Sequence, residues 1–150
     1  MTNVQDQGAG RPSAGNGIGI AALDGVWPWT QAVLRIGASL LFMEHGAMKL
    51  FGWFGAQEPM PLFSLMGLAG VLETFGGLLI LLGLLTRPVA LVLLVEMIVA
   101  YFMVHFRQGW IPLQNKGELA LLYALVFLFL LGNGAGPASL DRLIGRSAGR

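Results

Sequence analysis

Residues 62–85 read LFSLMGLAGVLETFGGLLILLGLL, an apolar run long enough to cross a membrane. A transmembrane helix needs about 20 mainly apolar residues to span a hydrocarbon core roughly 30 Å thick. Three further runs predict helices over about residues 29–51, 89–106 and 117–131. Pro88 suits the start of a helix and separates the second run from the third. The sequence therefore predicts an all-α polytopic membrane protein, folded as a four-helix transmembrane bundle.

The composition also favours a membrane environment. Hydrophobic residues make up 55% of the 150 residues and charged residues 11%, against about 45–50% and about 25% in soluble domains. The net charge of +1 gives no reason to expect nucleic acid as a partner. The chain has no cysteine, which excludes disulfides, thiolate metal sites and CxxC redox motifs.

The charges outside the apolar runs predict the orientation of the chain. Residues 1–25 are rich in Gly, Ser, Asn and Gln and predict a disordered tail, residues 26–136 form the transmembrane domain, and residues 137–150 form a basic tail. Four spans put both termini on one side. That side carries Arg11, Arg87, Arg142, Arg146 and Arg150, and the other carries Lys49, Arg107 and Lys116. The excess of Arg predicts that both termini are cytoplasmic.

The first apolar run contains four ionisable groups. At about 100° per residue, Arg35, His45 and Lys49 share one helical face, whereas Glu44 points the opposite way. Charged groups in a bilayer usually face the bundle interior, so we expect this face to point inward. Counting depth along each helix predicts that Arg35 and Glu96 form a buried charge pair, which either fixes the helix arrangement or has a functional role. Glu73 is a second or alternative partner of Arg35.

A second polar layer is expected near the outer helix ends. It contains His45, His105 and Glu118 as candidate catalytic residues, and Lys49, Glu73, Trp110 and Asn115 as candidate ligand-binding residues. Two alternatives remain: the lysines extend into the headgroup layer, or the histidines are polar packing groups. No HxxxH or HxxE spacing is present, so no metal site is predicted. Gly67, Gly70 and Gly77 predict close helix packing, although Gly76 and Gly77 also suggest room for a ligand ring beside Glu73.

Four stretches carry a resemblance to a known family. They are LRIGASLLFMEHGAMKLFGWFG at 34–55, ETFGGLLILLGLLTRPVAL at 73–91, EMIVAYFMVHFRQGWIPLQNKGELALLY at 96–123 and SLD at 139–141. In this order and spacing the chain resembles the DoxX family of small bacterial membrane proteins. The resemblance covers most of residues 30–142. It singles out Arg35, His45, Lys49, Glu73, Arg87, Glu96, His105, Asn115 and Glu118.

The resemblance implies a four-span protein of the bacterial inner membrane, linked to quinone-dependent oxidoreductase systems. A quinone carbonyl needs a hydrogen-bond donor, and its ring and tail need an apolar slot. The expected partners are the lipid bilayer, a quinone bound without a covalent bond and a partner redox enzyme, with a homo-oligomer left open. Whether the chain has an activity of its own stays open. The alternatives are a scaffold or assembly subunit that docks a partner enzyme, and a proton-coupled carrier.

Overall fold

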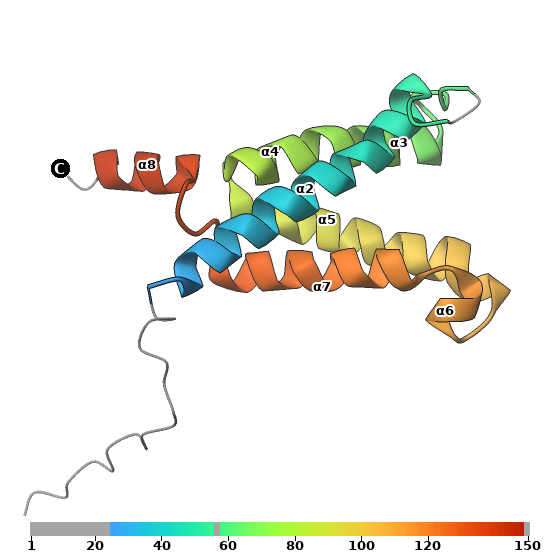
Figure 1. Cartoon of the computed structure of the whole chain (residues 1–150). Coiled ribbons are helices and arrows are strands. Elements are labelled where there is room, and N and C mark those ends of the chain that lie inside the picture. Colours follow the sequence, from blue (N-terminus) through green and yellow to red (C-terminus); the bar gives the residue numbers. More distant parts are fainter. Residues whose placement is uncertain (1–24, 56–57, 149–150) are drawn as a thin grey trace, which may run out of the picture.

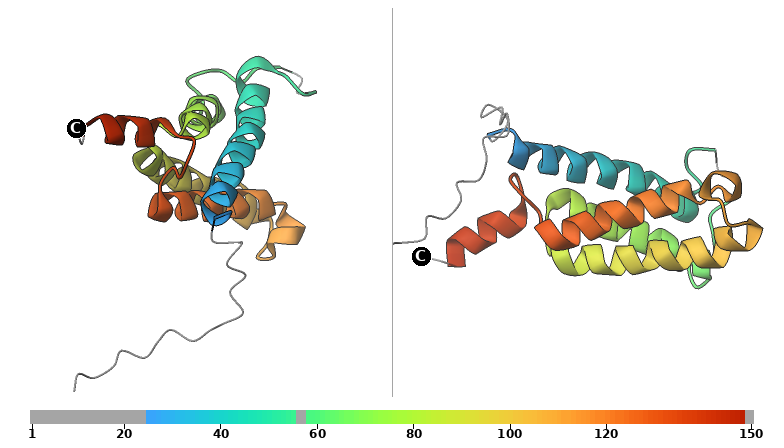
Figure 2. Two further views of the ribbon diagram at one scale, coloured as in Figure 1. Left: turned by 60° about the vertical axis from the view of Figure 1, so that its left-hand side comes forward. Right: turned by 90° about the horizontal axis from the view of Figure 1, so that it is seen from below.

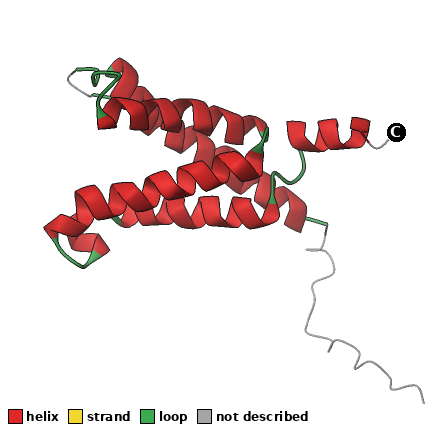
Figure 3. Ribbon diagram, turned by 180° about the vertical axis from the view of Figure 1, so that it is seen from behind, coloured by secondary structure: helices red, strands yellow, loops and turns green. Residues whose placement is uncertain are grey.

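The computed structural model describes residues 25–55 and 58–148, and every regular element within them is a helix (Figure 3). Ten helical elements follow one another within these described residues. They are α2 (Trp27–Phe51), α3 (Leu65–Val71), η1 (Leu72–Gly76), α4 (Gly77–Leu82), α5 (Thr86–Ala100), η2 (Tyr101–His105), η3 (Phe106–Gln108), α6 (Pro112–Asn115), α7 (Glu118–Asn133) and α8 (Leu140–Ala148). Some of these elements continue one another without a break, so the chain has four long helical segments within the described residues. They are α2, α3–η1–α4, α5–η2–η3 and α7.

The helices predicted from the four apolar runs are confirmed, with ends within about three residues of the expected ones. Leu65–Leu82 and Thr86–Gln108 are long and apolar enough to cross a membrane. The 16-residue α7 is apolar but shorter. The 25-residue α2 carries Arg35, Glu44 and Lys49 and does not meet the same criterion. Length and composition therefore mark two of the four long segments as candidate spans.

Local sequence sets the ends of the first two segments. Pro28 lies in the first turn of α2, where its missing N–H is not needed. Gly52 ends α2 in the left-handed conformation, with φ of 67°, and its N–H donates to Met48 O at 3.1 Å. Ser64 begins α3 because its hydroxyl oxygen accepts a hydrogen bond from Gly67 N at 3.0 Å.

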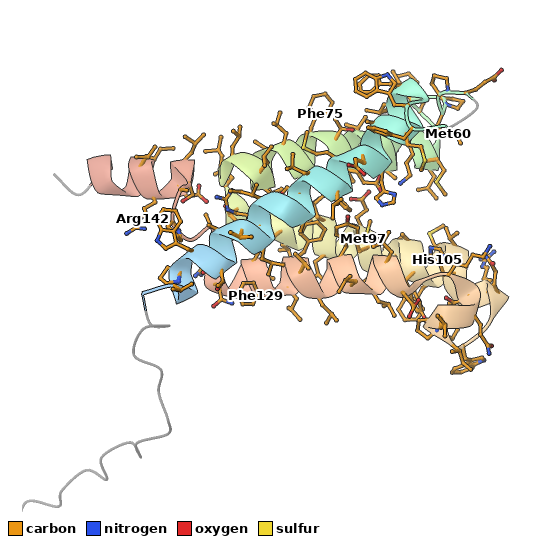
Figure 4. All side chains as sticks on the ribbon, in the orientation of Figure 1. Met60, Phe75, Met97, His105, Phe129 and Arg142 are labelled. Atoms are coloured by element: carbon orange, nitrogen blue, oxygen red, sulfur yellow. The ribbon has the colours of Figure 1, made fainter. Side chains whose placement is uncertain are left out.

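The long segments pack in two pairs. α2 lies along α3, η1 and α4, and α5 lies along α7 (Figures 1 and 2). The side chains between the pairs form one core, which includes Phe42, Ile80, Leu93, Phe127 and Leu130. Many large apolar side chains point outward instead, and Phe75 is 56% exposed on the outside of the upper pair (Figure 4). An exposed apolar surface of this kind suits contact with lipid tails.

Glycines let the helices approach closely, as predicted. A Cβ atom at Gly70 would lie 2.9 Å from Lys49 Cβ. A residue with a side chain at position 70 would therefore push α3 away from α2. A Cβ atom at Gly77 would lie 2.6 Å from Met43 Cγ. At Gly76 it would lie 2.8 Å from Leu93 Cδ2. Neighbouring helices therefore fill the space at Gly76 and Gly77, and the suggestion that they leave room for a ligand ring is wrong.

Arg35 joins α2 to two other parts of the chain. The side chain is fully buried, and its Nε donates to Ala135 O at 3.0 Å. Nη1 donates to Ile80 O at 2.8 Å and also to Leu81 O, while Nη2 donates to Ala138 O at 2.7 Å. The guanidinium thus binds the C-terminal carbonyls of α4, where the helix dipole is negative, and the loop before α8.

The predicted charge pair between Arg35 and Glu96 is wrong. The one salt bridge within the described residues joins Lys49 to Glu73, and backbone carbonyls satisfy Arg35 instead. Matching two residues by depth fixes their height in a bundle but leaves open the direction in which each side chain points. Both carboxylate oxygens of Glu96 are buried without a hydrogen-bond partner. An ionised carboxylate in this position costs several kcal/mol.

The predicted basic tail over residues 137–150 contains a helix, α8, that no apolar run predicts. α8 extends beyond the end of the bundle at which α2 begins (Figure 1). Asp141 anchors α8, because its Oδ1 accepts from Leu85 N at 2.7 Å and its Oδ2 from Thr86 N at 2.9 Å. Asp141 N also donates to Gly83 O at 2.8 Å. The tail predicted over residues 1–25 lies almost wholly outside the described residues.

Candidate functional site

A cavity of about 280 Å³ lies between α2, η1, α5–η2 and α7. Six polar side chains line it, together with Phe42, Met97, Ala100, Leu119 and Ala120. The polar residues are His45, Lys49, Glu73, His105, Lys116 and Tyr123. Figure 4 labels Met97 and His105, which lie in the space between the upper and lower helix pairs. We call this space the polar cavity.

One face of α2 forms one wall of the polar cavity. Phe42, His45 and Lys49 point into the cavity from α2 because they recur at intervals of three and four residues. Glu44 lies between them in sequence but is exposed, as its position on the opposite face predicts. Gly46 is buried on the same helix and allows close contact with η1, since a Cβ atom there would lie 2.6 Å from Thr74 N.

Lys49 and Glu73 form an ion pair at this wall. Lys49 Nζ donates to both carboxylate oxygens of Glu73. The Glu73 side chain is 5% exposed and the Lys49 side chain 19%, so the pair is largely removed from solvent. Both residues are predicted ligand-binding residues, and both line the cavity. Their mutual neutralisation allows two charged groups to remain beside an apolar core.

His105 is held in one orientation by a backbone carbonyl. Its Nδ1 lies 3.0 Å from Asn115 O, and a carbonyl oxygen can only accept, so Nδ1 carries the hydrogen. In the neutral ring, Nε2 is then a hydrogen-bond acceptor. Asn115 itself is buried and holds the α6 loop, because its Nδ2 donates to Gly109 O and its Oδ1 accepts from Gly117 N, both at 2.8 Å. Asn115 therefore orients His105 and does not line the cavity.

The two π turns within the described residues each carry a cavity residue. Glu73 lies in η1 and His105 in η2. A π turn inserts one extra residue into a helix and rotates the residues that follow, and such turns are frequent at functional sites. The sequence offers no clear signal for either turn. The turns help to bring Glu73 and His105 to the same cavity from two different segments.

His45 differs from His105 in having no side-chain hydrogen bond within the described residues. Its ring lies edge-on to Tyr123, with 6.1 Å between the ring centroids. The imidazole nitrogens of His45 are thus available to a ligand in the polar cavity. Tyr123 was not among the predicted site residues. Its only sequence signal is its spacing of four residues from Leu119, which places both on one face of α7.

Besides Asn115, the predicted site residues Glu118 and Trp110 also lie outside the polar cavity. Glu118, at the start of α7, is exposed and lines a neighbouring groove. Trp110 is 82% exposed and packs on Phe106, with ring centroids 5.0 Å apart. Both residues lie near the same end of the bundle as the cavity, which is what their positions beside the helix ends predicted. Nearness to a helix end does not determine which way a side chain points.

The groove beside Glu118 adjoins the polar cavity. It has a volume of about 800 Å³ and is mainly apolar, with Leu113, Leu122 and Leu125 among its lining residues. Lys116 and Leu119 line both the groove and the cavity. We call it the apolar groove. The polar cavity therefore adjoins the apolar groove, which is open on the outside of α7.

Comparisons with known proteins show the family to which the chain belongs. The DoxX family model matches residues 30–106. An uncharacterised protein of Haemophilus influenzae is 42% identical over 125 residues, which cover 76% of this chain and 90% of that protein. The inner membrane protein YqjF of Escherichia coli is 34% identical over 120 residues, which cover 76% of this chain and 91% of that protein.

A third relative extends the comparison to another bacterium. An uncharacterised membrane protein of Mycobacterium tuberculosis is 35% identical over 134 residues, covering 77% of this chain and 81% of that protein. No solved structure gives a significant match. The family match and the membrane proteins among the relatives lead to one conclusion. The chain belongs to the DoxX family and is an integral membrane protein.

Proposed function

We propose that the protein is a quinone-binding subunit of a membrane oxidoreductase system, with the quinone headgroup in the polar cavity. The observation that carries this proposal is the junction of the cavity with the apolar groove at Lys116 and Leu119. A lipid-soluble quinone has a polar head and a long apolar tail, and it needs both environments side by side. The cavity volume of about 280 Å³ is just below the range of about 300–1,000 Å³ for whole-ligand pockets, which suits a headgroup whose tail lies outside.

The hydrogen-bonding groups of the cavity match a quinone. Quinone carbonyl oxygens accept hydrogen bonds, and the ring N–H of His45 is available as a donor. Phe42 and Met97 provide apolar surface for the ring. His105 Nε2, an acceptor in the neutral ring, suits the hydroxyl of the reduced form. The cavity thus offers a group for each of the two redox states.

The two histidines suit proton transfer to and from the quinone. A quinone takes up two electrons and two protons when it becomes a hydroquinone. Histidine gives and takes protons near neutral pH, so His45 and His105 are the proposed proton carriers at the two quinone oxygens. The electrons come from a partner redox enzyme in this proposal. Glu118, outside the cavity, has no direct role in it.

The test of quinone binding uses equilibrium titration. The purified protein in lipid nanodiscs is titrated with short-chain benzoquinone and naphthoquinone analogues by calorimetry. His45→Gln should weaken binding by roughly 5- to 150-fold, the equivalent of about 1–3 kcal/mol for one unsatisfied polar group. Glu44→Gln is the matched control, because Glu44 is the neighbouring residue on the exposed face. Equal affinities in the parent and His45→Gln, or no binding by the parent, would contradict the quinone site and favour the alternative function of a scaffold subunit.

We also propose that all four long segments cross the membrane with both termini in the cytoplasm. α2 and α7 pack alongside the two segments that are long and apolar enough to span, and the buried face of α2 hides Arg35. The sequence places five arginines on the side of both termini against three Lys or Arg residues on the other side, and this excess supports cytoplasmic termini. Cysteines at Gly55 and Gln108 should react with an impermeant thiol reagent from outside, and one at Ser147 should not. Reaction of Gly55→Cys and Gln108→Cys from opposite sides would exclude four spans.

A further inference from the structure

A third hollow lies at the opposite end of the bundle from the polar cavity. It has a volume of about 480 Å³ and lies between α8, the start of α2 and the end of α4. Its lining includes Trp29, Leu82, Pro137, Arg142 and Leu143. We call it the α8 groove. Figure 4 shows Arg142 at this end and His105 at the other.

The α8 groove combines exposed apolar surface with one positive charge. Trp29, Leu82 and Leu143 are 57%, 43% and 59% exposed. Arg142 is exposed and takes no part in the one salt bridge within the described residues. The neighbouring carboxylate of Asp141 forms no salt bridge with Arg142, and its two oxygens accept hydrogen bonds from Leu85 N and Thr86 N instead.

Several hydrogen bonds hold α8 in place beside the bundle. Arg35 binds the carbonyls of Ala135 and Ala138 in the loop that leads to α8. Ser139 Oγ donates to Gly136 O at 2.8 Å within the same loop. Together with the contacts of Asp141, these bonds fix the position of Arg142 relative to Trp29. A groove that is formed before its ligand arrives loses little entropy on binding.

We infer that the α8 groove binds one anionic phospholipid. Arg142 binds the phosphate, since a guanidinium matches the geometry of phosphate oxygens. An acyl chain lies along Leu82 and Leu143, and Trp29 lies at the level of the headgroup, where tryptophan is enriched in membrane proteins. A zwitterionic headgroup brings its own positive charge close to Arg142. The groove therefore prefers a lipid with a net negative charge, independently of any quinone in the polar cavity.

The test uses Trp29 as the reporter. A variant in which Trp27, Trp53 and Trp110 are changed to Phe keeps Trp29 as its single tryptophan, and bromine on the acyl chains quenches tryptophan on contact. At equal mole fractions, brominated phosphatidylglycerol should quench Trp29 with an association constant roughly fivefold above that of brominated phosphatidylcholine. Arg142→Gln should abolish this preference.

The matched control is Arg87→Gln, which removes the same charge at the same end of the bundle but does not line the groove. Arg87→Gln should keep the preference for phosphatidylglycerol. Native mass spectrometry of the chain with all four tryptophans gives a second readout, in which one retained phosphatidylglycerol should disappear in Arg142→Gln. Equal quenching by both lipids, a preference that survives Arg142→Gln, or equal losses in Arg142→Gln and Arg87→Gln would overturn the inference.

Discussion

Lys49 Nζ donates to both carboxylate oxygens of Glu73, and this ion pair joins the last turns of α2 to the π turn η1. It is the one salt bridge within the part of the chain that the structure describes. The pair lies at the wall of the polar cavity, beside His45. It therefore connects the packing of two segments with the geometry of the proposed binding site.

Removing one partner of this ion pair should destabilise the fold. Glu73→Gln leaves the largely buried Lys49 ammonium without its counter-ion, and we expect a loss of about 3 kcal/mol in the free energy of unfolding. Lys49→Met combined with Glu73→Gln should restore part of the loss because it removes the unpaired charge. Unfolding in detergent micelles, measured for both single variants and the double variant, gives the coupling energy. Strictly additive losses would contradict an interacting pair.

Arg35→Leu should be among the most destabilising substitutions in the chain. It leaves four carbonyls without their buried donor, and each unsatisfied buried group costs about 1–3 kcal/mol. Arg35→Lys should recover only part of the loss, because an ammonium lacks the planar fork that reaches both α4 and the loop before α8. Thermal unfolding in detergent measures both variants.

Thermal unfolding of Glu96 variants tests the finding that Glu96 is not the partner of Arg35. Glu96→Gln removes a buried, unpartnered carboxylate, and we expect unchanged or higher stability. The double variant Arg35→Leu and Glu96→Gln should be no more stable than the two single effects predict. If removing Glu96 specifically rescued Arg35→Leu, the two residues would form a charge pair after all.

The four long helical segments could be predicted from the apolar runs, because a span needs a minimum length and because Pro88 favours a helix start between the second run and the third. The partners of Arg35 could not be predicted, since they are backbone carbonyls of α4 and of the loop before α8, and every residue type carries such a carbonyl. The grouping of His45, Lys49 and His105 near one end followed from their positions. Their convergence with Glu73 depends on two π turns, and a one-residue change in hydrogen bonding leaves no clear pattern in a sequence.

Gly46 and Gly37 lie on the same helix but have opposite surroundings. A Cβ atom at Gly46 would lie 2.6 Å from Thr74 N and 2.9 Å from Gly70 O, whereas one at Gly37 meets nothing within 4 Å. Gly46→Ala should therefore force α2 away from η1 and cost about 1–3 kcal/mol. Gly37→Ala should be neutral or slightly stabilising. Unfolding measurements that gave equal effects for the two variants would contradict the packing of α2 against η1.

The anchoring of α8 should depend on pH. Burial acts to raise the pKa of Asp141, but hydrogen bonds from Thr86 and Leu85 and the charge of Arg35 outweigh it and hold that pKa below its ordinary value. Because the folded state lowers this pKa, the Asp141 carboxylate contributes stability above its unfolded value of about 3.9, and the contribution is lost as the pH falls through the folded value.

Asp141→Asn should therefore lower stability at neutral pH and reduce its decline below about pH 4. The free energy of unfolding of both proteins, measured from pH 3 to pH 7, checks this prediction. The curves should approach each other at the acidic end. A constant difference over the whole range would show that the charge of Asp141 has no part in anchoring α8.

Photolabelling tests the central claim, quinone binding in the polar cavity, most directly. Photoreactive benzoquinone and naphthoquinone analogues are crosslinked to the protein in lipid nanodiscs, and labelled peptides are identified by mass spectrometry. We predict labelling of the α2 segment around His45 or the α7 segment around Tyr123, suppressed by excess unlabelled quinone and by His45→Gln but not by Glu44→Gln. Labelling confined to the end with α8, or labelling that excess quinone does not suppress, would contradict a quinone site in the polar cavity.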